Sequence, residues 1–366
     1  MLDEGIEHTQ SGAAVVDNEP DHSNSDESDT QGSLRPGARY INGQYKNTHP
    51  TQDLRDDLTK FDVAKRYIFD KNPKAEPKTS LPLIAMQKAE LEQERENSQI
   101  HLYRLGHSSI LLKLASEYWL IDPVFSTRAS PFSLFGPKRF HPAPLPIEQL
   151  PKIKGIIISH NHYDHLDEET IRRLRNYADF FVVPLGVKNI LHKWGVSKDK
   201  ITELDWWQST AVGDVSITAT PAQHFSGRSL VDGDATLWCS YAITFQGHSI
   251  FFSGDSGYFD GFKSIGDALG PFDIVIMEAG GYDKDWPDVH MTPEGAVDAY
   301  FDLGGRYLLP IHNGTFNLAF HDWQDPFEQV LKYSEVKGAI TLFPRFGERV
   351  ELEQPGQFSL WWRDVE

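Results

Sequence analysis

Four side chains that can bind a metal ion fall within six residues of this sequence. The segment 159–167 reads Ser-His-Asn-His-Tyr-Asp-His-Leu-Asp, and its candidate ligands are His160, His162, Asp164 and His165. The apolar residues 155–158 before it predict a short buried strand, and Asp167 with two glutamates after it predicts the start of a helix. Imidazole and carboxylate groups suit Zn²⁺, Fe²⁺ or Mn²⁺. The segment therefore predicts a metal-binding loop, with an exposed polar loop as the alternative.

Three further residues of the same types follow segments with a strand-like pattern. These residues are His224, Asp255 and His312, and they follow residues 215–220, 249–253 and 307–311. A single histidine in such a place is more often structural than a ligand, but three such residues together with the loop favour one metal centre. The predicted ligands are His160, His162 and His224 at one metal and Asp164, His165 and His312 at the other, with Asp255 bridging the two.

The composition excludes other kinds of site. The 366 residues carry 53 acidic and 35 basic side chains, a net charge of −18, which disfavours nucleic acid as a partner because such a chain repels phosphates. Cys239 is the only cysteine, so neither an internal disulfide nor a zinc site built from several thiolates can form. Any metal must therefore be held by histidine and carboxylate.

Neither a targeting segment nor a membrane-spanning segment is visible in the sequence. Residues 1–16 lack the basic start and the long apolar run of a signal peptide. Nothing approaches the ~18 consecutive apolar residues of a transmembrane helix. We therefore expect a cytoplasmic or peripheral membrane protein.

The chain divides into three predicted parts. Residues 1–38 are acidic and poor in apolar side chains, and predict a disordered tail. Residues 39–97 have helical periodicity in 54–69 and 85–96, and predict an arm packed on the main domain. Residues 98–366 predict an α/β layered domain with a helix opened by Thr292 and closed by Gly304. Its predicted strands span residues 110–114, 118–121, 155–158, 180–183, 214–220, 241–245, 249–252, 273–277 and 307–311.

The order of the candidate ligands resembles the signature of the metallo-β-lactamase superfamily, which is H-x-H-x-D-H followed by His, Asp and His. Within it, the sequence is similar to the N-acyl-phosphatidylethanolamine-hydrolysing phospholipase D branch over roughly residues 100–345. The metal motif is specific only to the superfamily, whereas Trp206-Trp207, residues 136–140 and Gly314-Thr315-Phe316 narrow the match to this branch. The matching segments are 105–109, 122–126, 128–131, 136–140, 159–167, 204–207, 221–224, 236–238, 254–258, 270–273 and 311–316.

This resemblance implies a fold, a cofactor and a reaction. The fold is an αββα sandwich with a dinuclear site at one edge, which holds two Zn²⁺ per chain, or Fe²⁺ or Mn²⁺ instead. Two metals about 3.5–4 Å apart share a bridging hydroxide, which would attack phosphorus and convert N-acyl-phosphatidylethanolamine to N-acylethanolamine and phosphatidic acid. A phospholipid substrate, a homodimer and contact with a membrane surface are also implied. The alternatives are a lactonase or soluble phosphodiesterase on the same fold, and a lipid-binding relative without activity.

Other residues near the predicted ligands have candidate roles. Asp255 and Asp164 would be catalytic through the metals, and the resemblance adds His290 as a catalytic residue beside the substrate. Asp122 is predicted to hydrogen-bond a metal-bound imidazole, with the capping of a turn as the alternative. For His107, support of the site and a plain loop position are the two alternatives. The predicted substrate contacts are Tyr163, Gln223, His290 and Asn313.

Two positions near the predicted substrate cleft depart from the resembling family. Asn313 stands where the family usually has tryptophan, and residues 281–285 read Gly-Tyr-Asp-Lys-Asp where it usually has Ala-Tyr-Glu-Pro-Arg. The resemblance therefore constrains the metal ligands more closely than the substrate.

The segment 125–140 is both apolar and basic on an acidic protein. It contains Phe132, Leu134, Phe135 and Phe140 together with Arg128, Lys138 and Arg139. Such a loop fits contact with a lipid surface. The alternative is a loop packed on the domain with its aromatic side chains buried.

Overall fold

The computed structural model describes residues 35–366 except 71, 96, 97, 133 and 230. Residues 36–366 form one compact unit. Of the predicted tail, residues 1–38, residues 1–34 lie outside the described part of the chain.

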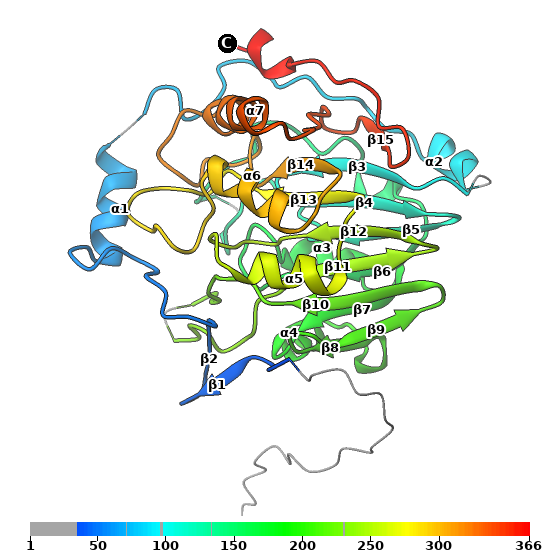
Figure 1. Cartoon of the computed structure of the whole chain (residues 1–366), viewed down its shortest axis with the longest axis horizontal. Helices are drawn as coiled ribbons and strands as arrows, with labels where there is room; N and C mark the ends of the chain where they lie inside the picture. The colour runs from blue at the N-terminus through cyan, green and yellow to red at the C-terminus, as the bar shows by residue number, and fades with distance from the viewer. Residues whose placement is uncertain (1–34, 71, 96–97, 133, 230) are drawn as a thin grey trace, which may run out of the picture. The chain divides into compact units, whose positions relative to one another are not determined.

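Two mixed β-sheets lie face to face in this unit (Figure 1). The seven-stranded sheet has the order β15-β3-β4-β5-β6-β7-β8, and the six-stranded sheet has the order β14-β13-β12-β11-β10-β9. The strands β1 and β2 pair separately in the N-terminal arm. The bounds of the strands in the two sheets and in the arm are β1 Arg39–Ile41, β2 Gln44–Lys46, β3 His101–Gly106, β4 Ser109–Leu114, β5 Glu117–Ile121, β6 Ile153–Ile157, β7 Ala178–Pro184, β8 Ile201–Leu204, β9 Ser209–Val212, β10 Val215–Thr220, β11 Ser240–Phe245, β12 His248–Phe252, β13 Ile274–Glu278, β14 Tyr307–Ile311 and β15 Arg349–Glu351.

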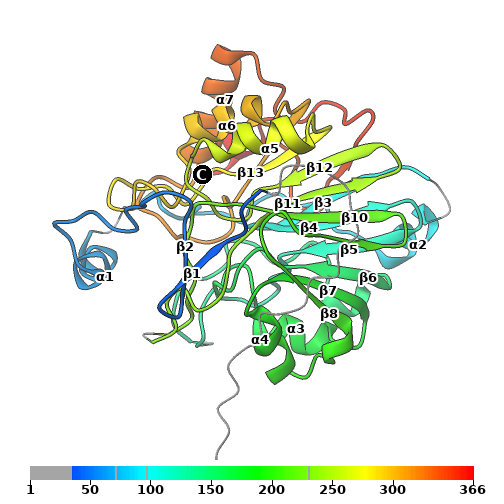
Figure 2. The same cartoon turned by 60° about the horizontal axis from the view of Figure 1, so that its bottom comes forward.

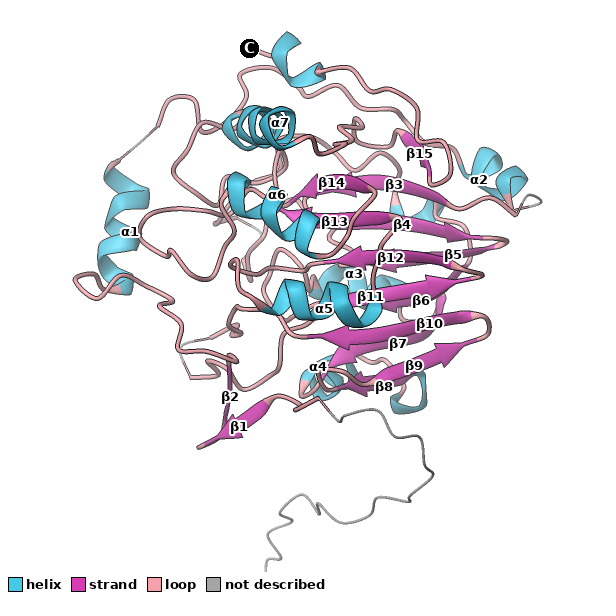
Figure 3. Ribbon diagram, viewed as in Figure 1, coloured by secondary structure: helices cyan, strands magenta, loops and turns pink. Residues whose placement is uncertain are grey.

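Helices cover the outer face of each sheet (Figure 3). Helices α5, α6 and α7 pack on the six-stranded sheet, and α3 and α4 pack on the seven-stranded sheet. Among the described residues, none of the helices combines the length and the apolar composition that crossing a bilayer requires. The helices are α1 Lys60–Phe69, α2 Lys88–Glu94, α3 Glu168–Leu174, α4 Val187–Lys193, α5 Gly261–Leu269, α6 Pro293–Asp302 and α7 Asp325–Lys337.

Alternating side chains along the strands build three apolar layers. Trp119 of β5 and Phe252 of β12 lie in the central layer between the sheets. Their neighbours point the other way, because successive strand residues face opposite sides. Leu120 packs toward α3 and α4, and Phe251 packs toward α5 and α6. The layers confirm the αββα sandwich that the resemblance implied.

The carboxyl ends of several strands meet at one edge of the sandwich. Strands β12, β13 and β14 are parallel to one another. Strand β10 runs in the same direction, because β10 and β12 are each antiparallel to β11. In the other sheet, β5 and β6 are parallel to each other. Each loop that carries a predicted ligand follows one of these strands.

Most predicted elements are found near their expected bounds, with one correction. The predicted strands 110–114 and 118–121 are β4 and β5, which pair as a hairpin, and Thr292 caps α6 by accepting a hydrogen bond from the Gly295 amide. Asp167 occupies the cap position of α3, but its side chain makes no capping bond to the helix backbone. Its carboxylate instead accepts hydrogen bonds from the backbone amides of residues 125 and 126. It therefore joins the apolar and basic loop to α3.

Candidate metal centre

Three imidazoles from the loops after β6 and β10 converge in a first group. Nδ1 of His162 lies 3.0 Å from Nε2 of His160 and 3.1 Å from Nε2 of His224. The opposite nitrogen of His160 lies 2.9 Å from Ser159 Oγ, and that of His224 donates to the Val289 carbonyl at 2.8 Å. The Nε2 lone pairs of these two rings therefore face the same space as His162. Lone pairs that converge in this way repel one another unless a cation lies between them.

Asp255 reaches from the loop after β12 to this group and to a second one. Its Oδ2 lies 3.6 Å from Nε2 of His160 and 3.7 Å from Nε2 of His224. The same oxygen lies 3.2 Å from Nε2 of His312, and Oδ1 lies 3.0 Å from Nε2 of His165. This carboxylate therefore stands between the two sets of imidazoles, where a bridging ligand would have to be.

Each group brings its potential ligand atoms close together. Within each, these atoms lie within 4.8 Å of one another. The first group is His160, His162, His224 and Asp255, and the second is His107, Asp164, His165 and His312. In the second group, Oδ2 of Asp164 lies 3.2 Å from Nε2 of His312 and 3.5 Å from Nε2 of His165.

Several of these buried atoms are close to one another without hydrogen bonds of ordinary geometry. Nε2 of His165, Nε2 of His312 and Oδ1 of Asp255 form no such hydrogen bond with any residue that the structure describes, although they lie 3.0–3.2 Å from oppositely charged groups. The donors are nitrogen and carboxylate oxygen, which zinc and related divalent metals accept. The donor set thus fits metal ions, and the two groups indicate a dinuclear site.

Burial and local charge favour the metal-binding forms of the three histidines of the first group and of Asp255. In the second group, burial opposes the charged forms of the rings, but the carboxylates beside them raise the pKa of His312 to about 10 and that of His165 well above the ordinary value, so a metal ion there would displace a proton from each ring. Burial lowers the pKa of His162 to about 4 and holds the pKa of His160 and His224 well below the ordinary value, so these rings are neutral. Burial would raise the pKa of Asp255, but the neighbouring His165 and other imidazoles hold it well below its usual value. Neutral imidazoles and an ionised carboxylate are the forms in which these groups bind metals.

Asp122, which was predicted to support an imidazole, lies directly behind the second group. Its Oδ2 accepts a hydrogen bond from Nδ1 of His165 at 2.7 Å, and its Oδ1 accepts one from the Ser159 amide at 2.7 Å. Its backbone φ of 41° is in the left-handed region, which is unfavourable for a residue other than glycine. The hydrogen bond turns Nε2 of His165 toward Asp255, as an outer partner of a metal ligand does.

His107 lies inside the second group. Its Nε2 is 3.0 Å from Oδ2 of Asp164, and the centroid of its ring is 4.0 Å from that of His312. Its backbone amide donates to Thr315 Oγ1 at 2.6 Å. The structure therefore places His107 beside the predicted ligands, where it could support the site.

Glu278 is a residue of this site that the sequence analysis missed. It is buried at the end of β13, and its carboxylate accepts a hydrogen bond from Nδ1 of His290 at 2.9 Å and one from the Ser256 amide at 3.1 Å. His290 in turn offers a ring nitrogen within 4.8 Å of ligand atoms of Asp255 and His312. Glu278 is a polar residue at the carboxyl end of an apolar strand. The predicted ligands also follow the carboxyl ends of apolar strands, so the same sequence pattern could have identified Glu278.

Two of the predicted substrate contacts hydrogen-bond to neighbouring backbone. The hydroxyl of Tyr163 donates to the Arg228 carbonyl at 2.7 Å, and the Arg228 guanidinium lies 4.0 Å from the centre of the tyrosine ring. Nε2 of Gln223 donates to the Asp288 carbonyl at 2.9 Å. Both side chains therefore hold neighbouring loops, at residues 228 and 288, in place around the site.

Asn313 and the segment 281–285, the two departures from the family, are also tied to neighbouring groups. Asn313 is buried, and its Oδ1 accepts a hydrogen bond from Nη2 of Arg104 at 2.5 Å. Asp283 and Asp285 both pair with Nη1 of Arg66 in α1, at 2.6 and 2.5 Å. The N-terminal arm therefore holds the loop 281–285, which lies beside the edge of the sandwich that carries the predicted metal ligands.

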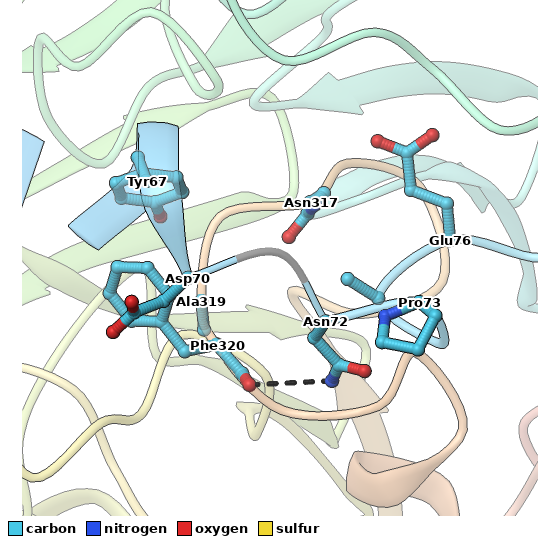
Figure 4. Close-up of a pocket in the computed structure, with 9 residues that line it drawn as sticks. Tyr67, Asp70, Asn72, Pro73, Glu76, Asn317, Ala319 and Phe320 are labelled. Atoms are coloured by element: carbon cyan, nitrogen blue, oxygen red, sulfur yellow. Dashed lines mark hydrogen bonds between the residues drawn. The ribbon is translucent and has the colours of Figure 1, made fainter. Parts of the chain in front are cut away.

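A pocket of about 380 Å³ lies at another junction between the arm and the main domain (Figure 4). Asn72 and Asn317 line it, and Asp70 and Glu76 lie on opposite sides of it. None of the predicted site residues lines this pocket. It is separate from the two ligand groups, and no group of potential metal ligands among the described residues includes its carboxylates.

Comparison with known proteins agrees with this geometry. The family model described as "Beta-lactamase superfamily domain" matches residues 118–313, which carry all seven predicted ligands. The chain belongs to the metallo-β-lactamase superfamily. Together with the ligand groups, membership of this superfamily indicates a metal-dependent hydrolase.

Similar curated proteins cover different shares of the chain. An uncharacterised protein of Mycobacterium tuberculosis is 37% identical over 328 residues, which are 88% of this chain and 87% of that protein. An N-acyl-phosphatidylethanolamine-hydrolysing phospholipase D of Caenorhabditis elegans is 36% identical over 58% of this chain and 63% of its own length. The mitochondrial enzyme of that name from Saccharomyces cerevisiae is 34% identical over 74% of this chain and 60% of its own length.

The fold also matches solved structures. A metallo hydrolase of the archaeon Ignicoccus hospitalis superposes with a TM-score of 0.55 over 71% of this chain and 100% of that protein, at 20% identity. This likeness supports the αββα fold.

Proposed function

We propose that this protein is a phosphodiesterase of phospholipase D type with two metal ions, which hydrolyses N-acyl-phosphatidylethanolamine to N-acylethanolamine and phosphatidic acid. The observation that carries the proposal is the pair of ligand groups with Asp255 between them, in a chain that is 34–36% identical over 58–74% of its length to two enzymes named for this reaction. Two Zn²⁺ ions suit the donor set, and Fe²⁺ or Mn²⁺ would suit it too.

When bound, the two metals would supply a hydroxide at neutral pH and neutralise the charge of the phosphate. His160, His162 and His224 would hold one ion, Asp164, His165 and His312 the other, and Asp255 both. In the reaction, water adds to phosphorus and the bond from phosphorus to the ethanolamine oxygen breaks. The attacking water releases a proton and that oxygen needs one, and we propose that Nε2 of His290 takes up the first and passes it to the oxygen, because Nδ1–H is held by Glu278 at 2.9 Å.

We expect Glu278→Gln to lower kcat about 10–100-fold, because the amide no longer fixes the orientation and charge of the His290 ring. Bound metal should remain at the level of the parent protein, because Glu278 belongs to neither ligand group. Steady-state kinetics together with metal analysis measure both effects. Glu294→Gln, on the exposed start of α6, is the control. A kcat within about twofold of the parent would contradict the role of Glu278.

The test of the reaction itself is product analysis. The metal-loaded protein is incubated with N-acyl-phosphatidylethanolamine in mixed micelles, and N-acylethanolamine and phosphatidic acid are measured by mass spectrometry. Release of both in equal amounts supports the proposal. Two metals per chain with no release would rule out the lipid substrate and leave the metal centre in place.

A lactone or a soluble phosphodiester is the second candidate substrate. The structural observation that favours it is the segment 281–285, where Asp285 stands in place of the family's usual arginine and, together with Asp283, pairs with Arg66. A panel of lactones and soluble phosphodiesters, tested with the same protein, separates this candidate from the first. Faster turnover of either class than of the lipid would favour it. The third interpretation, a lipid-binding protein without activity, predicts lipid binding with no turnover of any substrate.

We also propose that the segment 125–140 contacts the lipid surface that carries the substrate. Phe132, Leu134 and Phe135 are exposed by 63%, 76% and 71%, so the interpretation with these side chains buried does not hold for them. Phe140 does pack against the core under the six-stranded sheet. The exposed apolar side chains would enter the bilayer, and the neighbouring Arg128 would meet lipid phosphates.

We expect the triple variant Phe132→Ser, Leu134→Ser and Phe135→Ser to weaken binding to vesicles of phosphatidylcholine and phosphatidylglycerol by at least about tenfold, because burying each such side chain contributes about 1.5–3 kcal/mol. Sedimentation with the vesicles measures the binding. The control is Val336→Ser with Ile340→Ser, two residues at and after the end of α7 that are exposed by 75% and 56%. Equal loss in the control, or no loss in the triple variant, would contradict the contact.

A further inference from the structure

The N-terminal arm reaches the back of the metal centre through one side chain. Asn47 follows β2 in the hairpin drawn in dark blue in Figure 2. Its Nδ2 donates to the His224 carbonyl at 2.8 Å, and its Oδ1 accepts from the His224 amide at 3.1 Å. The same Oδ1 accepts from Nε1 of Trp238 at 3.0 Å. One carboxamide thus pairs with both backbone polar groups of a predicted metal ligand, as an adjacent strand would.

His224 depends on this contact because it lies beyond the sheet. Strand β10 ends at Thr220, four residues earlier, and the imidazole is held on its outer side by one hydrogen bond to the Val289 carbonyl. His224 is fully buried. A buried backbone group left without a partner costs about 1–3 kcal/mol. Without Asn47, two such groups of His224 would move toward other partners, and the ring would move with them.

We propose that Asn47 is a positioning residue for the metal centre, which fixes the backbone of His224 so that Nε2 of this ring meets the nitrogens of His160 and His162. This inference rests on the proposed metal centre. It adds that the centre is completed by the arm, because Asn47 lies outside the matched residues 118–313. A motif drawn from the superfamily domain therefore does not contain every residue that sets the affinity for metal.

We expect the variant Asn47→Ala to fold, so that its affinity for metal can be measured. Asn47, His224 and Trp238 line a surface pocket of about 340 Å³, so water can reach the backbone groups that the variant exposes. Water offers those groups partners but does not fix their position. The variant should therefore fold and bind metal less well.

The experiment is a titration of the metal-free, full-length protein with Zn²⁺ in competition with a chromophoric chelator. We expect Asn47→Ala to weaken the binding of one of two ions by about 10–100-fold, the usual effect of losing an outer partner of a ligand. The other ion should change by no more than about twofold. Asn47→Asp keeps the acceptor for the His224 amide but turns a charged oxygen toward the His224 carbonyl, so it should also lose affinity. Absorption spectra of the Co²⁺-loaded proteins should change for both variants.

The matched control is Gln44→Ala. Gln44 lies in the same hairpin and joins it to the main domain through a hydrogen bond from Nε2 to the Gly233 carbonyl at 3.1 Å, and its Oε1 accepts one from Nζ of Lys46 at 2.8 Å. Parent-like affinity in Gln44→Ala with loss in both Asn47 variants supports the proposal. Equal loss in Gln44→Ala would overturn it, since docking of the arm alone would then matter.

Other outcomes also decide the matter. Parent-like affinity in both Asn47 variants would overturn the proposal, and so would circular dichroism showing that both are unfolded without metal while Gln44→Ala is folded. Two ions in the parent with no difference among the variants would refute the role of Asn47 alone. A parent that binds no zinc would refute the metal centre, and the inference with it.

Discussion

Replacing Asp255 with asparagine is expected to reduce kcat/KM by well over 100-fold and to leave fewer than two metal ions per chain. Oxygens of this carboxylate lie 3.0–3.7 Å from imidazole nitrogens of both ligand groups, and a neutral amide cannot hold two cations together. Loss of an outer partner of a ligand already costs 10–100-fold, so loss of the shared ligand must exceed that range. Hydrolysis assays and metal analysis of the same preparation measure the two effects.

The control for this variant is Asp267→Asn. Asp267 is exposed on α5 and pairs with Lys263, so its substitution should leave kinetics and metal content within about twofold of the parent. An Asp255→Asn protein that keeps two ions and at least a tenth of the parent's activity would contradict the bridging role.

Replacing Asp122 with alanine should lower the free energy of unfolding of the metal-free protein by about 3–5 kcal/mol, the usual effect of removing one partner from a buried ion pair. The substitution leaves Nδ1 of His165 and the Ser159 amide without their acceptor in a fully buried place. Zinc affinity should fall as well, because the His165 ring loses the bond that orients it. Urea denaturation with and without metal measures both effects.

Two comparisons make this prediction specific. Asp122→Asn keeps the shape and one acceptor oxygen, so it should lose less stability than Asp122→Ala. Asp179→Ala removes a surface partner of Lys152 and should change stability by no more than about 1 kcal/mol. A loss below about 1 kcal/mol in Asp122→Ala would show that the carboxylate supports neither His165 nor the loop after β6.

The predicted ligands could be found in the sequence because each of them follows the end of a strand. The apolar patterns before His224, Asp255 and His312 mark β10, β12 and β14, and these three strands run in the same direction. Residues at their carboxyl ends must therefore lie at one edge. The spacing within residues 160–165 places four more candidates there. For residues that follow the ends of such strands, the local sequence pattern is enough to predict that they lie together in the fold.

Contacts between distant parts of the chain could not be predicted in this way. Asn47 meets His224 across 177 residues, and Arg66 meets Asp283 across 217. Nothing in the local pattern of the arm indicates these partners. The side chain of Asp167 was expected to cap α3, but it bonds the loop at residues 125–126, a competing set of donors that becomes visible only in three dimensions.

Asn313 shows a similar limit. The resemblance placed Asn313 near the substrate cleft, and in the structure its amide oxygen accepts a hydrogen bond from the buried guanidinium of Arg104. The neighbour in sequence of a site residue can face the interior, because the backbone of His312 turns through a left-handed conformation with φ of 63°. Side-chain direction after such a turn does not follow from residue order.

The most direct test of the central claim is anomalous diffraction from crystals of the zinc-loaded, full-length protein, with data collected on both sides of the zinc absorption edge. Two anomalous peaks are predicted, about 3.5–4 Å apart. One should lie among His160, His162 and His224, the other among Asp164, His165 and His312, with Asp255 in contact with both. No peak at this edge of the sandwich, or a single peak outside these two groups, would contradict the dinuclear centre and the hydrolysis built on it.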